Sequence, residues 1–149
     1  KSNFKKMKQI ETELCIDANP EKVWSLLTDF ENHPRWNPFI TSIHGEKKIG
    51  GQLTVSIKPP GGNGMTFKPI VTSFKENTEF RWKGKLGIQG IFDGEHYFQL
   101  VGQENNRTKL VHGEQFSGIL VPFMGKALDK TKEGFELMNK SLKIASELA

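Results

Sequence analysis

The chain begins with a stretch in which apolar and polar residues alternate. Within residues 9–17, Ile10, Leu14 and Ile16 fall on one side of an extended chain, and mostly polar residues fall on the other. A period of two residues is typical of a strand that is buried on one face only. The pattern therefore predicts a first strand over residues 9–17.

Two short helices are expected after this strand. Asn19 precedes a proline, and the pair combines a good helix cap with a residue that is preset for the first helical turn. We therefore expect a helix over residues 20–28. The next stretch, residues 29–39, contains two prolines and favours a second very short helix or turn that directs Trp36 and Phe39 inward.

Six further segments have the composition of strands and are separated by turn signals. Stretches rich in glycine, proline or asparagine divide them, as in the run over residues 59–64. Connections this short imply an antiparallel meander. The expected strands cover residues 40–46, 52–58, 65–74, 78–86, 91–101 and 108–119.

The period changes after Pro122, where apolar residues recur every three or four positions and predict one long amphipathic helix. About 26 residues at about 1.5 Å each give it a length of ~40 Å. Gly134 is expected to permit a bend or a close approach to the sheet, since glycine otherwise costs about 1 kcal/mol there. The chain is thus expected to be an α+β protein: a seven-stranded curved antiparallel sheet around a long carboxy-terminal helix, with two short helices after the first strand.

Composition and charge narrow the class of protein. With 149 residues, 36% of them hydrophobic and 26% charged, the chain fits one globular domain over residues 1–149. It has no run of roughly 20 apolar residues, so no integral membrane association is expected. Cys15 is the single cysteine and no apolar leader is visible, which favours a cytoplasmic location. The net charge of +4 accompanies no nucleic-acid-binding motif, so no nucleic-acid partner is expected.

Four stretches of the sequence resemble the START/Bet v 1-like superfamily, also called SRPBCC. They are IDANPEKVWSLLTDFENHPRWNPFI, GIFDGEHYFQL, TKLVHGEQFSGIL and KEGFELMNKSLKIASE, and the order of the expected elements is also similar. The resemblance covers residues 9–148 and looks closest to the bacterial polyketide cyclase/dehydrase-like branch.

This resemblance implies a helix-grip fold with a deep cavity between sheet and helix. In the superfamily, such a cavity receives a lipid, a polyketide, a hormone-like molecule or another apolar compound. Members include carriers, sensors, cyclases, oxygenase domains and chaperone activators, so the fold by itself does not decide the chemistry. The superfamily often has a glycine-rich loop between its second and third strands, and residues 45–51 occupy that place at the expected mouth of the cavity.

Alternation along the later strands predicts which face is inward. Phe80 and Trp82 alternate with charged residues at odd positions, so the even-numbered residues are expected to face the helix. Even-numbered residues are also predicted inward in the next two strands. A hairpin between these strands places His96 beside His112 and Glu114.

The cluster of His96, His112 and Glu114 has three interpretations. Its members satisfy one another and fix the strand register, anchor the polar end of a ligand, or act as an acid-base group in catalysis. No nucleophile or second acid is evident nearby, so the three are catalytic candidates only. Their spacing lacks the HExxH pattern of zinc enzymes, and no metal site or cofactor is expected. His33 and His44 lie in turn or edge segments and are expected at the surface.

Large aromatic side chains on the concave face are expected to shape an apolar pocket. Together with the polar cluster and one helix residue, the expected ligand-binding residues are Trp36, Phe67, Trp82, Phe92, His96, Phe98, His112, Glu114, Phe116 and Leu128.

The leading hypothesis is the binding or transport of a small hydrophobic or amphipathic ligand, lipid-like or polyketide-like, in an interior cavity. The first alternative is a cyclase or dehydratase that uses His96, His112 and Glu114 in the same cavity, although the sequence leans against an enzyme. The second alternative is a protein-interaction module such as a co-chaperone. Composition and pattern leave the identity of the ligand and the oligomeric state open.

Overall fold

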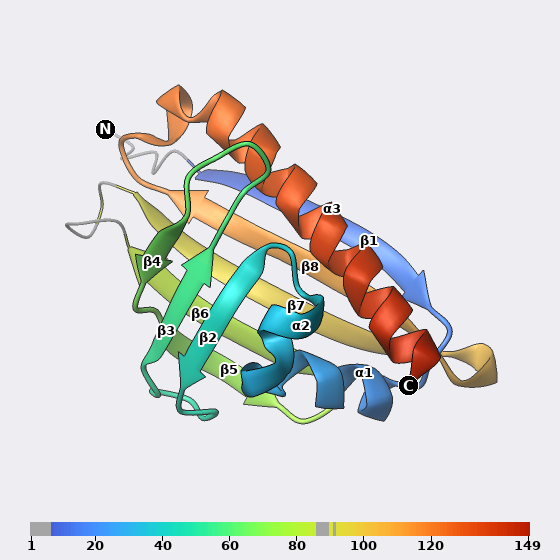
Figure 1. The fold of residues 1–149 in the computed structure, drawn as a ribbon. Coiled ribbons are helices and arrows are strands. Elements are labelled where there is room, and N and C mark those ends of the chain that lie inside the picture. Colours follow the sequence, from blue (N-terminus) through green and yellow to red (C-terminus); the bar gives the residue numbers. More distant parts are fainter. Residues whose placement is uncertain (1–6, 86–89, 91) are drawn as a thin grey trace.

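The elements follow the predicted order in the computed structural model, which describes residues 7–85, 90 and 92–149 (Figure 1). The described strands are β1 (Met7–Ile16), β2 (Ile40–Gly45), β3 (Leu53–Ile57), β4 (Met65–Phe67), β5 (Ile70–Lys75), β6 (Glu79–Lys85), β7 (Asp93–Gln103) and β8 (Arg107–Ser117). The helices are α1 (Pro20–Leu27), α2 (His33–Trp36) and α3 (Gly125–Leu148), with short 3-10 helices η1 (Phe30–Asn32), η2 (Glu104–Asn106) and η3 (Val121–Phe123). Positions 86 and 91, expected at the ends of two strands, lie outside the described residues.

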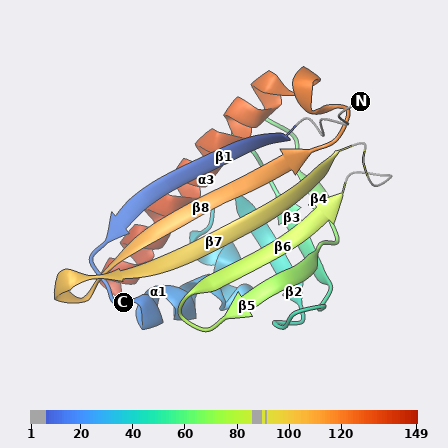
Figure 2. The same ribbon diagram turned by 180° about the vertical axis from the view of Figure 1, so that it is seen from behind.

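The strands form two antiparallel sheets. β1, β8, β7, β6 and β5 lie side by side in this order, as Figure 2 shows. β2, β3 and β4 form a second sheet that crosses in front of the first in Figure 1. A bridge between Gln52 and Ile70 links the two sheets. In the β7–β8 hairpin, His96 lies directly opposite Glu114, as the predicted cluster requires.

Residues 65–74, expected as one strand, form two. β4 ends at Phe67 and β5 begins at Ile70. Pro69 lies between them and has no N–H to donate to a neighbouring strand. Its carbonyl oxygen accepts a hydrogen bond from the backbone of Leu53 at 2.9 Å. The chain passes here from the second sheet to the first, so the described residues contain eight strands rather than the expected seven.

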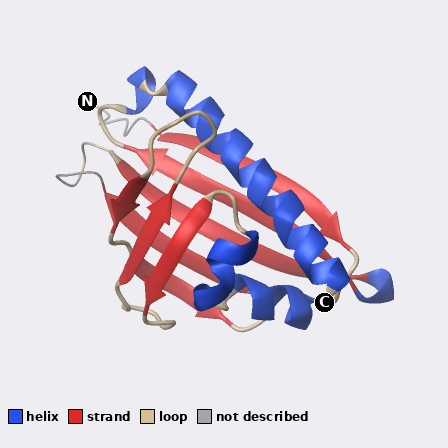
Figure 3. Cartoon of the chain, viewed as in Figure 1, coloured by secondary structure: helices blue, strands red, loops and turns tan. Residues whose placement is uncertain are grey.

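The long helix α3 packs its apolar stripe across the inner face of the sheet, as predicted. Leu128, Phe135, Met138 and Leu142 are buried, and the helix contacts β1, β8 and α1. Figure 3 shows α1, α2 and α3 on the same side of the five-stranded sheet. This arrangement is the helix-grip fold. Within the part of the chain that the structure describes, no helix is both long and apolar enough to cross a membrane.

The first short helix begins at the predicted cap. The side chain of Asn19 accepts a hydrogen bond from the backbone N–H of Lys22 at 2.9 Å, which satisfies one of the free donors at the start of α1. Val23, Trp24 and Leu27 then fall on one side of α1 and are buried. The cap and this stripe together fix the helix against the sheet.

His33 is buried, whereas its turn segment predicted an exposed position. Its Nε2–H donates to the backbone carbonyl of Leu27 at 2.6 Å, and its Nδ1 accepts from the side chain of Asn37 at 3.2 Å. Because both ring nitrogens have partners, the ring can be buried without an unsatisfied polar atom. Burial also lowers its pKa. His44 is exposed, as predicted.

Gly134 permits a close approach of α3, as the sequence suggested, but the partner is the ring of Phe39 just before β2 and not a strand of the sheet. An ideal Cβ at position 134 would lie 2.4 Å from the Phe39 ring. We therefore expect Gly134→Ala to destabilise the protein by about 1–3 kcal/mol, as overpacking does. Alanine would otherwise stabilise a helix interior by roughly 1 kcal/mol.

Urea unfolding measures this difference in the free energy of unfolding. Gly125→Ala is the matched control, because an added Cβ at that position of the same helix would meet no described atom within 4 Å. A Gly134→Ala protein more stable than the wild type would contradict the proposed contact.

Candidate ligand-binding site

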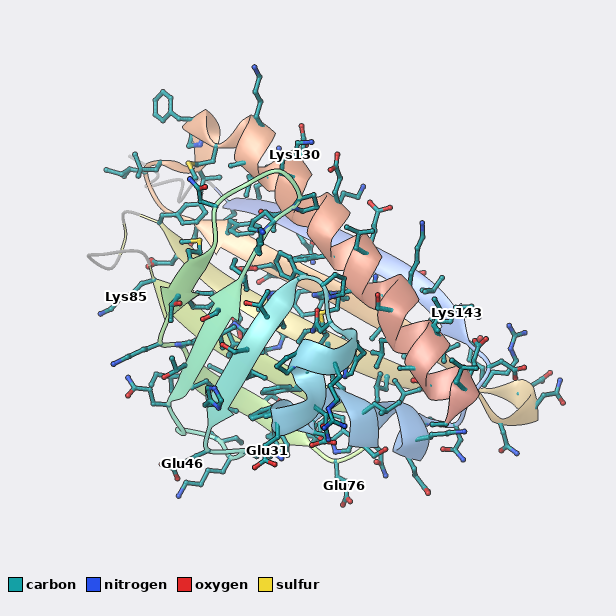
Figure 4. The ribbon with its side chains drawn as sticks, viewed as in Figure 1. Glu31, Glu46, Glu76, Lys85, Lys130 and Lys143 are labelled. Carbon is teal, nitrogen blue, oxygen red and sulfur yellow. The ribbon has the colours of Figure 1, made fainter. Side chains whose placement is uncertain are left out.

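A cavity of about 360 Å³ lies between the two sheets and the first half of α3. Its lining is mostly apolar and aromatic. The charged, imidazole and hydroxyl side chains among the described lining residues are Lys85, His96, Glu114, Lys130 and Thr131. In Figure 4, Lys85 extends from the end of β6 and Lys130 from the first half of α3. The side chains of His96 and Glu114 come instead from paired positions on β7 and β8.

Seven of the ten residues expected to contact a ligand line this cavity. They are Phe67, Trp82, Phe92, His96, Glu114, Phe116 and Leu128.

Trp36, Phe98 and His112 do not belong to the lining. The Trp36 ring packs against the ring of His33, with centroids 4.9 Å apart. The ring of Phe98 packs on the ring of His112, with centroids 4.4 Å apart, and both side chains are almost completely buried in the core. Alternation along a strand correctly predicted that Phe98 and His112 face inward, but it does not predict whether a side chain reaches a cavity or is covered by its neighbours.

The loop between β3 and β4 forms one side of the cavity. Pro59, Pro60, Gly61 and Gly62 all contribute to the lining. The sequence suggested only a tight turn here and placed residues 45–51 at the cavity mouth. Residues 45–51 precede β3 whereas the lining loop follows it, so the two loops lie at opposite ends of that strand. The paired prolines were the available signal, because they add apolar surface to an otherwise glycine-rich turn.

Five hydrogen bonds join Glu114 to α3 and β1 in one continuous chain. Glu114 Oε1 lies 2.9 Å from His96 Nδ1, and His96 Nε2 lies 2.7 Å from His112 Nε2. His112 Nδ1 lies 2.8 Å from Asn139 Oδ1. Asn139 Nδ2 lies 2.8 Å from Thr12 Oγ1, which lies 2.8 Å from the backbone carbonyl oxygen of His112. The three residues of the predicted cluster therefore meet, and two further residues extend it.

The positions of the protons in this chain follow from its final acceptor. A backbone carbonyl only accepts, so the Thr12 hydroxyl donates to it and receives the Asn139 amide N–H. Asn139 Oδ1 then accepts from His112 Nδ1–H. A neutral His112 accepts at Nε2, so His96 donates through its own Nε2. A neutral His96 accepts at Nδ1, and the carboxyl of Glu114 carries the proton for this last bond.

Burial favours this uncharged arrangement. The 18% of the Glu114 side chain that remains accessible opens into the apolar cavity, and burial raises the pKa of Glu114 to about 8. Burial lowers the pKa of His96 to about 3. Burial and the neighbouring His96 hold the pKa of His112 well below its ordinary value. All three groups are therefore uncharged at neutral pH.

Aromatic rings enclose both imidazoles. Trp82 stacks on His96 with ring centroids 4.7 Å apart and planes inclined by 14°. Phe135 stacks on His112 with centroids 4.2 Å apart and planes inclined by 18°. These faces keep water away from the rings, so the hydrogen bonds within the chain are the ones that the ring nitrogens can form.

Sequence reasoning missed Thr12 and Asn139. Asn139 lies four residues after Phe135 and three before Leu142, so helical spacing does place it on the buried face. A polar side chain at such a position needs partners. That requirement was the signal for Asn139. The same signal was available for Thr12, which alternates with Ile10, Leu14 and Ile16 on the inward face of β1.

Gly94 provides space for the carboxyl of Glu114. An ideal Cβ at position 94 would lie 2.1 Å from Glu114 Oε2. Gly94 lies two residues before His96 on the same face of β7, so a side chain here would push the carboxyl away from the imidazole. A glycine inside a strand often marks such a close approach.

No group of three His, Cys, Asp or Glu side chains is arranged to hold a metal ion in the described ranges, residues 7–85, 90 and 92–149. The His96 ring lies between His112 and Glu114 and bonds to each of them. Their ligand atoms therefore face one another in pairs rather than converging on one point.

The helix-grip fold with an apolar cavity along its helix defines the class, that of START/Bet v 1-type proteins. More specifically, the chain belongs to the family described as polyketide cyclase / dehydrase and lipid transport, which matches residues 7–144. Among curated proteins, none matches the chain significantly.

Solved structures share the fold at low sequence identity. A protein of unknown function from Staphylococcus aureus is 15% identical over 99% of this chain and 98% of its own, with a TM-score of 0.74. A START superfamily protein from Mycobacterium smegmatis is 22% identical over 94% of this chain and 97% of its own, with a TM-score of 0.72. The di-domain ARO/CYC StfQ from the steffimycin biosynthetic pathway is 13% identical over 95% of this chain and 51% of its own, with a TM-score of 0.69. At these identities, the likeness shows the fold alone.

The raised pKa of Glu114 predicts a pH dependence of stability. The folded protein keeps a proton up to about pH 8, whereas the unfolded chain releases it near the ordinary value of 4.5. The stabilisation is complete below that ordinary value and is lost as the pH rises through the folded pKa. Between pH 5 and pH 8, we expect the wild type to lose stability relative to Glu114→Gln at up to ~1.4 kcal/mol per pH unit.

Urea unfolding of both proteins at four pH values in this range measures the difference. Glutamine is a suitable reference because its amide N–H can donate to His96 and does not titrate. The lowered pKa values of the histidines have the opposite effect, with stability rising up to about pH 6.5, but this effect is common to both proteins. A difference that stays constant with pH would show that Glu114 is already ionised in the folded protein.

Proposed function

We propose that the protein binds or transports a small hydrophobic or amphipathic molecule, lipid-like or polyketide-like, inside the cavity. The observation that carries the proposal is the cavity of about 360 Å³ with its apolar lining and few polar groups. Small-molecule pockets typically have volumes of roughly 300–1,000 Å³ and this kind of lining. The family description, which includes lipid transport, supports the same function.

The chemistry of the walls favours an apolar occupant. Trp82, Phe92 and Phe116 present aromatic side chains to the cavity. Covering such surface contributes about 25 cal/mol for each Å² of apolar area removed from water. Protein interiors are normally packed as densely as organic crystals, so an apolar ligand would also supply dispersion contacts that these side chains lack.

A cyclase or dehydratase activity is the second candidate, and the position of Glu114 favours it. The carboxyl of Glu114 lies at the cavity wall and has a pKa of about 8, so its open oxygen Oε2 can receive a proton from a bound substrate while Oε1 gives its own proton to His96. Within the candidate trio, His96 positions this acid, whereas His112 lies behind His96 and outside the lining. If the protein is an enzyme, Glu114 is therefore the group that would meet the substrate.

Several expectations about the setting of the protein stay predictions from the sequence. They are a single domain over residues 1–149, a cytoplasmic location, the lack of a nucleic-acid partner and the interaction-module alternative. The proposed function does not depend on them, because the cavity is formed by residues between positions 39 and 131.

Filling the cavity from α3 should abolish ligand binding. Thr131 lines the cavity, and the adjacent Lys132 is exposed and outside the lining. We expect Thr131→Trp to weaken the binding of the apolar dye N-phenyl-1-naphthylamine by at least about tenfold, a loss of about 1.4 kcal/mol. Lys132→Trp should bind the dye as the wild type does.

Fluorescence titration gives both affinities, and circular dichroism checks that both variants are folded. Native mass spectrometry of gently purified wild-type protein then tests for a captured molecule. A wild type that binds neither the dye nor any molecule from its host would contradict the proposed function.

A further inference from the structure

One carboxyl oxygen of Glu114 faces the cavity and has no hydrogen-bond partner among the described residues. Oε1 is engaged by His96 Nδ1 at 2.9 Å. Oε2 lies above Gly94, where only the missing side chain of glycine leaves space for it. Glu114 and Gly94 both line the cavity. Oε2 is therefore a fixed polar atom on a mostly apolar wall.

Oε2 can only accept a hydrogen bond from a molecule in the cavity. The proton of the carboxyl is held on the Oε1 side, in the bond to His96. If this proton crosses to His96, Glu114 becomes a carboxylate and Oε2 is again an acceptor. Oε2 is therefore a hydrogen-bond acceptor whether Glu114 is protonated or ionised.

From this polarity we propose that the ligand carries an uncharged hydrogen-bond donor, such as an alcohol or phenol hydroxyl, at its inner end and donates it to Glu114 Oε2. The inference rests on the proposed function, because it names the class of ligand that the cavity holds. A carboxylate or phosphate at this place would set acceptor against acceptor. It would also bury an unpaired charge beside Phe92 and Phe116, which is unfavourable.

The other charged, imidazole and hydroxyl groups of the lining do not bind the inner end of the ligand. His96 uses both ring nitrogens within the hydrogen-bonded chain. Thr131 donates to a backbone carbonyl of its own helix at 2.9 Å. Lys85 and Lys130 are exposed, and they extend from the end of β6 and the first half of α3 (Figure 4). A charged group on a ligand would therefore lie at these lysines, away from Glu114.

Two probes of nearly equal size test the proposal. 2-Naphthol has a hydroxyl donor, whereas in 2-methoxynaphthalene a methyl group replaces the donor proton. Isothermal titration calorimetry at pH 7 is expected to show that the wild type binds 2-naphthol about tenfold more tightly, the value of one hydrogen bond. Glu114→Gln should keep the preference, because its amide donates to His96 through Nε2 and presents Oε1 as the acceptor. Glu114→Leu should remove it.

The possible results separate this proposal from the proposed function. Equal binding of the two probes by the wild type would overturn the donor preference while leaving the cavity as a binding site. A preference that survives in Glu114→Leu would also overturn it, because the hydroxyl would then be held elsewhere. Failure of the wild type to bind either probe would contradict the proposed function itself. The two probes on the wild type decide the question even when Glu114→Leu is too unstable to assay.

Discussion

The side-chain amide of Asn139 is the interaction on which the interior of the protein depends. It lies on α3, is 3% exposed, donates to Thr12 on β1 and accepts from His112 on β8. One residue thus ties the helix to two neighbouring strands. An amide suits this position because it presents one donor side and one acceptor side. Each partner left unsatisfied would cost about 1–3 kcal/mol, so the same contact fixes both the position of the helix and the proton order that leads to Glu114.

The interior beside α3 is filled differently along the helix. From Phe135 onward, Phe135, Met138 and Leu142 are completely or almost completely buried. The Phe135 ring stacks on the His112 ring, which fills the interior at that level. Nearer the start of the helix, the Leu128 and Thr131 side chains line the cavity instead. The open space therefore lies beside the first turns of α3.

Alternation and helical spacing predicted the order of the elements and the inward faces, but not the depth of a side chain. His96 and Phe98 both face inward, yet only His96 reaches the cavity. Tyr97 has an odd number and faces outward, yet it is almost completely buried. Its ring lies across Gly113, where an added Cβ would come within 2.4 Å of the tyrosine oxygen. The role of Asn139 depends on partners 27 and 127 residues away, and no local pattern contains such a pairing.

The hydrogen bonds of the chain run in one direction, and this direction makes Glu114 a hydrogen-bond acceptor at the cavity wall. Replacing both partners of a buried hydrogen bond by apolar groups of the same shape can be nearly neutral or even stabilising, so stability alone gives no reason for such a long polar chain. Inside the core, each member of the chain from Thr12 to His96 has its partner. At Glu114, which is the last member, one oxygen stays unshared among the described residues and points into the space between sheet and helix. The chain ends in an open acceptor whose protonation is set from β1 and α3, which ties the chemistry at the cavity to the contacts that hold the helix in place.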